Sequence, residues 1–188
     1  MSTPFLVLLI TGILLILPGI WIVFTKAVFT MKKRRLEAEK EAIELTLTRY
    51  YDILSQHIRA ARRFVAYENA AFDELLRWRL STNDRLSLQM NETYFVKMLE
   101  VEKNLEKFYE THPELFKKPV IQKLLDDYHL VHQAFIRHRR RLNGAIASYN
   151  AMMTSFPHNL IAKLFKLTTE SFFKTEPHIP FDENIRQV

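Results

Sequence analysis

A run of twenty apolar residues, 5 to 24, lies near the start of the chain and contains no charged side chain: FLVLLITGILLILPGIWIVF. Fifteen of these residues are Leu, Ile, Val or Phe, and twenty helical residues extend about 30 Å, the thickness of the hydrocarbon core of a bilayer. A cleaved signal peptide needs basic residues before such a run and small residues after it. The run is preceded by uncharged MSTP and ends in bulky WIVF, so the pattern predicts a transmembrane helix.

Basic residues follow this predicted span, and none precedes it. The nearest are Lys26 and the group Lys32, Lys33, Arg34 and Arg35. Because the basic flank of a span stays in the cytoplasm, we expect the N-terminus outside and residues 26–188 inside. The group at residues 32–35 serves either as a topology signal alone or also as a contact with anionic lipid headgroups.

Helical spacing of apolar residues continues along most of the chain. There is neither Gly nor Pro between residues 32 and 80, and apolar residues recur every three or four positions from residue 43 onward, which is the spacing of one helix face. Two further helices are predicted at about 84–109 and 119–153, separated by a proline-containing loop at 111–119. The residues predicted to face the core are Ile43, Leu47, Tyr50, Leu54, Ile58, Ala61, Val65, Phe72, Leu76, Leu86, Met90, Tyr94, Met98, Val101, Leu105, Phe108, Ile121, Leu125, Tyr128, Val131, Phe135, Leu142, Ile146, Tyr149 and Met153.

A short fourth helix is predicted in the decamer FPHNLIAKLF, residues 156–165. Ser155 is a suitable cap, and Pro157 suits the first helical turn. The apolar face of this helix comprises Phe156, Leu160, Ile161, Leu164 and Phe165. Two interpretations stay open: the helix closes the open end of the bundle, which we favour, or it lies on a membrane surface or a partner. Further apolar residues follow this helix, and we expect them to wrap over the bundle: Phe172, Phe173 and Phe181.

The predicted fold is therefore all-α, with an N-terminal transmembrane helix and an antiparallel bundle of three long helices and a short C-terminal helix. The expected parts are an anchor over residues 1–25, a solvated charged stalk over 26–42, the helical bundle over 43–176 and an extended tail over 177–188. Composition agrees, because 3 Gly in 188 residues leave few turns, and the absence of Cys excludes disulfides and Cys-based zinc sites. The net charge of +6 suits an anionic membrane surface or nucleic acid without choosing between them.

Three motifs in the chain resemble those of a known family. The stretch SYNAMMTSFPHNLIAKLF holds a Tyr-Asn pair followed by Phe-Pro-x-Asn-Leu-Ile-Ala, RYYDIL stands at residues 49–54, and HPEL at 112–115. With the N-terminal span, they resemble the LemA family, although SQHI and HLVHQAFI depart from the family pattern. The resemblance implies a helical bundle anchored in the bacterial inner membrane, with no established activity, and hints at scaffolding near membranes. The residues matching the C-terminal motif, implied to be structural, are Tyr149, Asn150, Phe156, Pro157, Asn159, Leu160, Ile161 and Ala162.

The best candidate for metal chemistry is Asp126-x-x-His129-x-x-His132. This spacing puts the three side chains on adjacent helix positions, and helical bundles build di-iron sites from paired Glu-x-x-His motifs. A second such motif is missing, Asp replaces Glu, and His57 is an unproven partner from the first helix. A polar helix face with surface histidines is the preferred interpretation, so we expect neither a metal nor a cofactor.

The basic run RHRRR, residues 137–141, is the candidate for binding nucleic acid. Consecutive residues spread around a helix, so a patch forms only where Arg59, Arg62 and Arg63 lie on a neighbouring helix and join Arg137 and Arg141. A solvated or lipid-facing basic surface is preferred. The sequence also lacks a glycine-rich phosphate loop, a nucleophile elbow and a His-Glu-x-x-His motif.

The expected function is non-enzymatic: a membrane-anchored scaffold or interaction module with a protein partner or a second copy of the chain. The alternatives are a metal-binding bundle and a basic bundle that binds nucleic acid.

Overall fold

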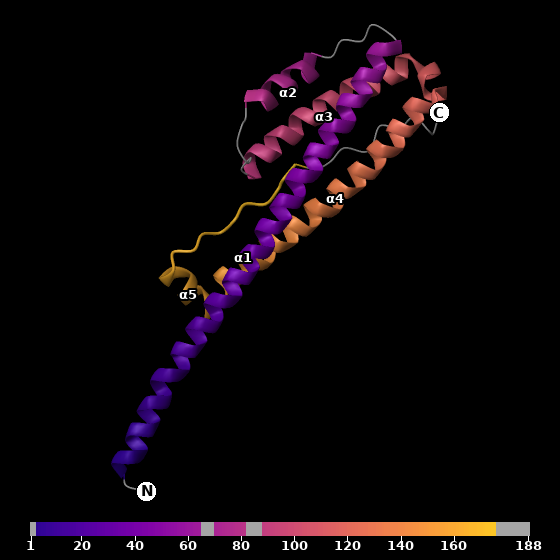
Figure 1. Cartoon of the computed structure of the whole chain (residues 1–188). Helices are drawn as coiled ribbons and strands as arrows, with labels where there is room; N and C mark the ends of the chain where they lie inside the picture. The colour runs from indigo at the N-terminus through magenta and orange to yellow at the C-terminus, as the bar shows by residue number, and fades with distance from the viewer. Residues whose placement is uncertain (1–2, 65–69, 82–87, 176–188) are drawn as a thin grey trace. The chain divides into compact units, whose positions relative to one another are not determined.

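The computed structural model describes residues 3–64, 70–81 and 88–175, and these fold into helices joined by short segments (Figure 1). Among the described residues there is no strand, so the predicted all-α class is confirmed. The elements are α1 (Thr3–Phe64), α2 (Ala70–Ser81), α3 (Leu88–Thr111), the 3-10 helix η1 (Pro113–Lys117), α4 (Pro119–Thr154) and α5 (His158–Leu164). The predicted extended tail at 177–188 and Phe181 lie outside the described residues.

The first helix ends earlier than the uninterrupted helical pattern of residues 32–80 predicts. It is continuous from the apolar segment at residues 5–24 through the charged stretch, and it ends at Phe64 rather than near residue 80. Two basic residues, Arg62 and Arg63, stand in its last turn, where they complement the negative end of the helix dipole. Farther along the predicted helix, residues 70–81 form the separate α2.

The α2 helix packs beside α1 and α3 (Figure 1). The ring of Phe72 stacks on that of Tyr51, with centroids 5.9 Å apart. The carboxylate of Asp73 pairs with the guanidinium of Arg62 at 3.4 Å, and Glu74 accepts a hydrogen bond from Lys97 on α3. These contacts make α2 an additional member of the bundle.

The extra helix sets the directions of those that follow. Tyr50 on α1 contacts Glu102 on α3, and His57, seven residues later, contacts Tyr109, also seven residues later. The two helices therefore run in the same direction. On α4 the matching positions descend from Tyr128 to Leu124, so α4 runs antiparallel to α1.

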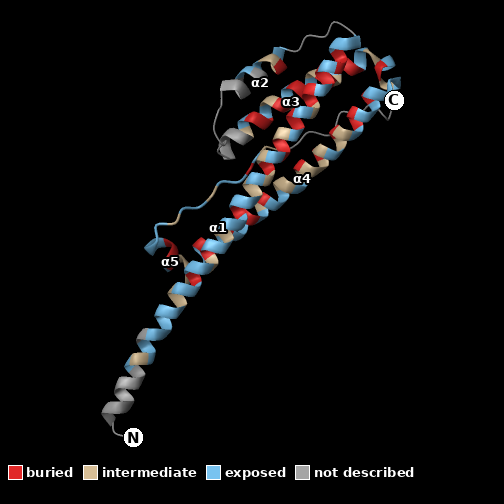
Figure 2. Ribbon diagram, viewed as in Figure 1, coloured by how far each residue is buried: buried red, intermediate tan, exposed pale blue. Residues whose placement is uncertain are grey.

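The core follows the predicted apolar stripes closely (Figure 2). Of the inward positions that the structure describes, all are buried except Val131, which is half-buried while the next residue, His132, is fully buried. The side chains of Val65, Leu76, Leu86 and Met90 lie outside the described part.

The chain divides into two compact units, Met1–Ala38 with Asn143–Phe172, and Glu39–Leu142 with Phe173–Val188. We call them the first and the second unit. The predicted stalk falls mostly in the first unit, and one side of it is packed rather than solvated: Phe29 and Leu36 are 3% and 0% exposed. The ring of Phe29 meets Tyr149 of α4 edge-on at 6.2 Å, and Lys32 Nζ donates to Ser148 Oγ at 2.5 Å.

Candidate functional site

Four polar side chains meet inside the second unit, and we call them the buried polar cluster. Tyr50 comes from α1, Glu102 from α3, and Tyr128 and His132 from α4; each is at most 1% exposed. Tyr50 Oη donates to Glu102 Oε2 at 2.8 Å, and Tyr128 Oη donates to the other carboxylate oxygen. Tyr50 Oη also lies 3.2 Å from Tyr128 Oη and 3.2 Å from His132 Nδ1.

The number of available protons fixes how these groups are bonded. Each phenol carries one proton, and both protons go to the Glu102 carboxylate. With that proton given to Glu102, Tyr50 Oη is left as an acceptor, and a bond from His132 requires the tautomer with its proton on Nδ1. Burial, reinforced by the nearby carboxylate, raises the pKa of Tyr50 well above its ordinary value. Burial, then Tyr50 and Glu102, does the same to the pKa of Tyr128, so both phenols stay protonated donors.

A second bonded histidine lies in the same core. His57 Nε2 is 3.1 Å from the carbonyl oxygen of Leu124, and His57 Nδ1 is 2.9 Å from Tyr109 Oη. A carbonyl oxygen only accepts, so Nε2 carries the proton and Nδ1 accepts from the tyrosine hydroxyl. Burial lowers the pKa of His57 from 6.5 to about 4, against a smaller opposing effect of the Leu124 carbonyl. The ring is therefore neutral at neutral pH.

Aromatic rings enclose the buried polar cluster on one side. Phe95 and Phe135 stack with their centroids 4.1 Å apart, and Tyr50 meets both edge-on at 6.0 Å and 6.3 Å. Phe173, which is 0% exposed, covers them at 6.2 Å and 5.8 Å. In such a water-free setting, leaving a carboxylate without its partners lowers the stability of the fold by about 3 to 5 kcal/mol. The cluster thus holds α1, α3 and α4 in one register, since sliding any of them separates Glu102 from its donors.

The three predicted metal ligands point in different directions. Asp126 is exposed, His129 is half-buried and His132 belongs to the buried polar cluster. Their partner in that hypothesis, His57, is bonded to Tyr109 and Leu124. No group of three or more His, Asp or Glu side chains that could hold a metal ion occurs within residues 3–64, 70–81 and 88–175. Within the described residues, the structure therefore does not bring Asp126, His129 and His132 together as one set of metal ligands.

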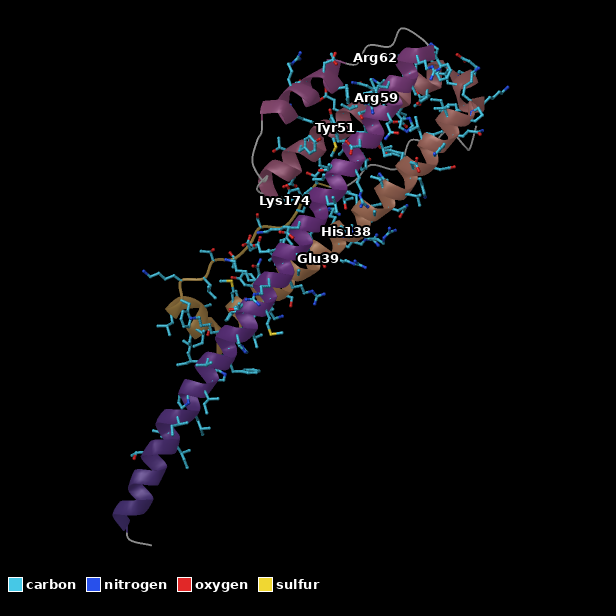
Figure 3. The ribbon with its side chains drawn as sticks, in the orientation of Figure 1. Glu39, Tyr51, Arg59, Arg62, His138 and Lys174 are labelled. Atoms are coloured by element: carbon cyan, nitrogen blue, oxygen red, sulfur yellow. The ribbon has the colours of Figure 1, made fainter. Side chains whose placement is uncertain are left out.

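The basic run lies around α4 as its spacing predicts. Arg137, Arg140 and Arg141 are exposed, whereas His138 and Arg139 are half-buried. Arg139 Nη2 donates to the carbonyl oxygen of Lys174 at 3.2 Å. Lys174 and His138, the neighbour of Arg139 in the chain, are labelled in Figure 3. On α1, the side chains of Arg59, Arg62 and Arg63 are exposed.

Several of the family-motif residues have clear structural contacts in the first unit. Tyr149 is buried against Phe29. Asn150 clamps the backbone of Glu170: its Nδ2 donates to the Glu170 carbonyl at 2.8 Å, and its Oδ1 accepts from the Glu170 N–H at 2.9 Å. Ile161 and Ala162 are buried, Pro157 and Asn159 are half-buried, and Phe156 and Leu160 are exposed.

The start of α5 differs from the prediction. Pro157 is the N-cap residue, and no side chain caps the helix. The hydroxyl of Ser155 donates to the Met152 carbonyl at 3.2 Å, and Ser155 stands before the N-cap position rather than at it. At the other end, Leu167 N–H bonds to Ala162 O and Lys166 N–H to Lys163 O, the pattern of a Schellman motif. Lys166 takes the left-handed position with φ 50°, which usually favours glycine.

The short helix lies beside the apolar part of α1. The His158 ring is 6.3 Å from that of Trp21, and Lys26 Nζ lies 4.6 Å from the centroid of the Phe165 ring. Among the described residues, α1 is the one helix long and apolar enough to cross a membrane, and only 12% of its most apolar window is buried.

The comparisons bear on this arrangement. The protein-family model described as LemA family matches residues 39–184 of the chain. This range includes the buried polar cluster, α5 and all three motifs singled out in the sequence. Comparison with curated proteins gives no match.

Proposed function

The chain belongs to the LemA family, and from that premise we propose that it is a membrane-anchored helical scaffold. In this proposal α1 crosses the bacterial inner membrane once, and the cytoplasmic helices hold a protein partner or a second copy of the chain.

The observation that carries the proposal is the exposure of the apolar part of α1. A helix in the core of a water-soluble protein is covered by other elements, and continuous apolar patches of this size are rarely left in water. Here large apolar side chains between residues 13 and 24 are roughly half to two-thirds exposed: Ile13, Leu14, Ile16, Leu17, Ile20, Val23 and Phe24. Each favours a bilayer over water by about 0.3 to 0.6 kcal/mol near the middle of a helix, so lipid is the natural covering.

The basic residues support the proposed orientation. Lys26, Lys33, Arg34 and Arg35 follow the apolar segment and are exposed, which suits the cytoplasmic surface of the membrane. Residues 26–188 would then lie in the cytoplasm and the N-terminus outside.

The polar core supports a structural rather than a catalytic role. The groups with the most unusual chemistry, Tyr50, Glu102 and His132, are bonded to one another and are at most 1% exposed. A substrate would reach them only if the helices separated. Contacts with a partner are therefore expected on the exposed faces of the long helices.

The anchor is tested by washing native membranes with alkaline carbonate and by adding protease outside whole cells. We expect the full chain to stay with the lipid and its C-terminal part to resist the protease. Release by carbonate, or digestion of the C-terminal part, contradicts the anchor or its orientation respectively.

The scaffold is tested by crosslinking in native membranes. The chain contains no Cys, so a single crosslinker can be placed at Leu45→Cys or Leu130→Cys, at residues that are 56% and 66% exposed. Recovery of one defined partner or oligomer is expected from at least one position. The buried Leu54→Cys, at a residue that is 0% exposed, is the matched control and should give none. Monomer alone from both exposed positions, at native abundance, contradicts the scaffold.

A further inference from the structure

The outer surface of α5 is apolar and exposed. Leu160 and Leu164 on α5 are 53% and 64% exposed, and Phe156, two residues before the helix, is 79% exposed. We call these three residues the α5 apolar surface. Leu160 and Leu164 are four residues apart in one helix and therefore lie on the same side. The neighbouring Ile161 and Ala162 are buried, so α5 is held to the protein by one side and presents apolar side chains on another.

Contacts within the first unit fix the level of this surface along α1. Ser148 lies at Lys32, and Tyr149 lies at Phe29. Farther along the chain, His158 lies at Trp21, and α5 then turns back so that Phe165 lies at Lys26. At 1.5 Å for each helical residue, Trp21 stands about 4.5 Å before the last residue of the apolar segment, Phe24. The start of α5 is thus level with the final turn of that segment, and its end is just beyond.

We infer that the α5 apolar surface inserts into the membrane interface next to α1, at the boundary between headgroups and acyl chains. This inference rests on the proposed function, since it requires α1 to cross the bilayer. Short amphipathic elements sit at that depth with their apolar side in the acyl region and basic residues at the headgroups. Lys163 on α5 and Lys166 just after it are exposed, and exposed Lys26 stands beside Phe165, as attraction to anionic lipid requires.

Lipid suits this surface better than a protein partner does. The bilayer that covers Val23 and Phe24, which are 70% and 66% exposed, continues sideways to whatever lies at the same level of α1. The α5 apolar surface begins at that level because His158 contacts Trp21. A protein partner would have to enter the interface itself in order to cover these residues.

The absence of Cys allows a depth measurement on the full chain. Leu160→Cys is labelled with a polarity-sensitive fluorophore, and the protein is placed in vesicles of neutral and anionic phospholipid. Quenching is compared between a nitroxide on the lipid near the headgroup and iodide in the water. Phe24→Cys is the control at the end of the proposed span, and Leu130→Cys, at an exposed leucine of the second unit, is the matched control in water.

The expected result is that the label at residue 160 resembles the one at residue 24. Lipid nitroxide should quench it, and iodide should quench it several times less than the label at Leu130→Cys. Leu164→Cys is labelled in parallel, so that the measurement stands where one of the two variants does not fold.

Three outcomes overturn the inference. If the label at residue 24 is quenched by lipid and those at 160 and 164 behave as at 130, α5 lies in water although α1 is an anchor. If the α5 labels are protected from iodide but not quenched by lipid, a protein covers them. If the label at residue 24 also escapes lipid quenching, the proposed membrane anchor fails with the inference.

Discussion

Mild acid is expected to destabilise the second unit through His57. The unfolded chain binds a proton at this residue below about pH 6.5, whereas the folded protein, whose His57 has a pKa of about 4, does so only near that lower pH. The unfolded state therefore holds more protons between these values, and the free energy of unfolding falls as the pH falls. The contribution of His57 is fully present above about pH 6.5 and is lost as the pH approaches 4.

The size of the effect follows from the two pKa values. Their difference, at about 1.4 kcal/mol for each pH unit, corresponds to about 3 kcal/mol when the loss is complete. About 2 kcal/mol of this is lost between about pH 7 and pH 5. Set against a typical free energy of unfolding of about 5 to 15 kcal/mol, such a loss is easily measured.

Urea unfolding of the full chain in detergent micelles, followed by far-UV circular dichroism, measures this change at each pH. His57→Gln is the matched control, because a glutamine amide can donate to the Leu124 carbonyl and accept from Tyr109 but does not titrate. The other histidines are common to both proteins, so subtracting the two pH dependences isolates residue 57. Equal pH dependence in the two proteins, within about 0.5 kcal/mol, would refute the assignment of a buried neutral His57.

Three further changes probe the remaining contacts. Tyr128→Phe should lower the free energy of unfolding by about 3 kcal/mol, because it leaves buried Glu102 with one phenol donor fewer. The double variant with Glu102→Leu should lose less free energy of unfolding than the sum of the two single variants. Strict additivity in urea unfolding would argue against the bond. Lys166→Gly should stabilise the first unit by about 1 kcal/mol, because glycine adopts φ 50° without strain, and slower amide hydrogen exchange in α5 is the measurement. Asn150→Ala should speed hydrogen exchange at the Glu170 N–H by roughly fivefold, since that bond contributes about 1 kcal/mol, and unchanged exchange would show that the clamp is not formed.

The sequence predicted most of the core because apolar spacing and helix packing obey the same period. The buried polar cluster was accessible to the same reasoning, although the sequence analysis did not identify it. Glu102 stands four residues after Met98 and three before Leu105 on the apolar stripe, and His132 has the same relation to Tyr128 and Phe135. A polar residue at a stripe position was the available signal. Which donors would meet it depends on three helices together, and no single helix pattern contains that information.

The end of α1 at Phe64 had no comparable signal, because neither Gly nor Pro occurs between residues 32 and 80. This early end also bears on where α5 lies along α1. In a bundle of three alternating helices, the last long helix would run parallel to the first, and the decamer at 156–165 would lie far from the apolar segment. The additional helix α2 reverses this order, so that α4 runs antiparallel to α1 and Tyr149 reaches Phe29. The contact between His158 and Trp21 then follows, and so does the opportunity for the α5 apolar surface to meet lipid. The two interpretations of the short helix, closure of the bundle and contact with a membrane, now apply to different sides of α5: Ile161 and Ala162 are buried, whereas Leu160 and Leu164 are exposed.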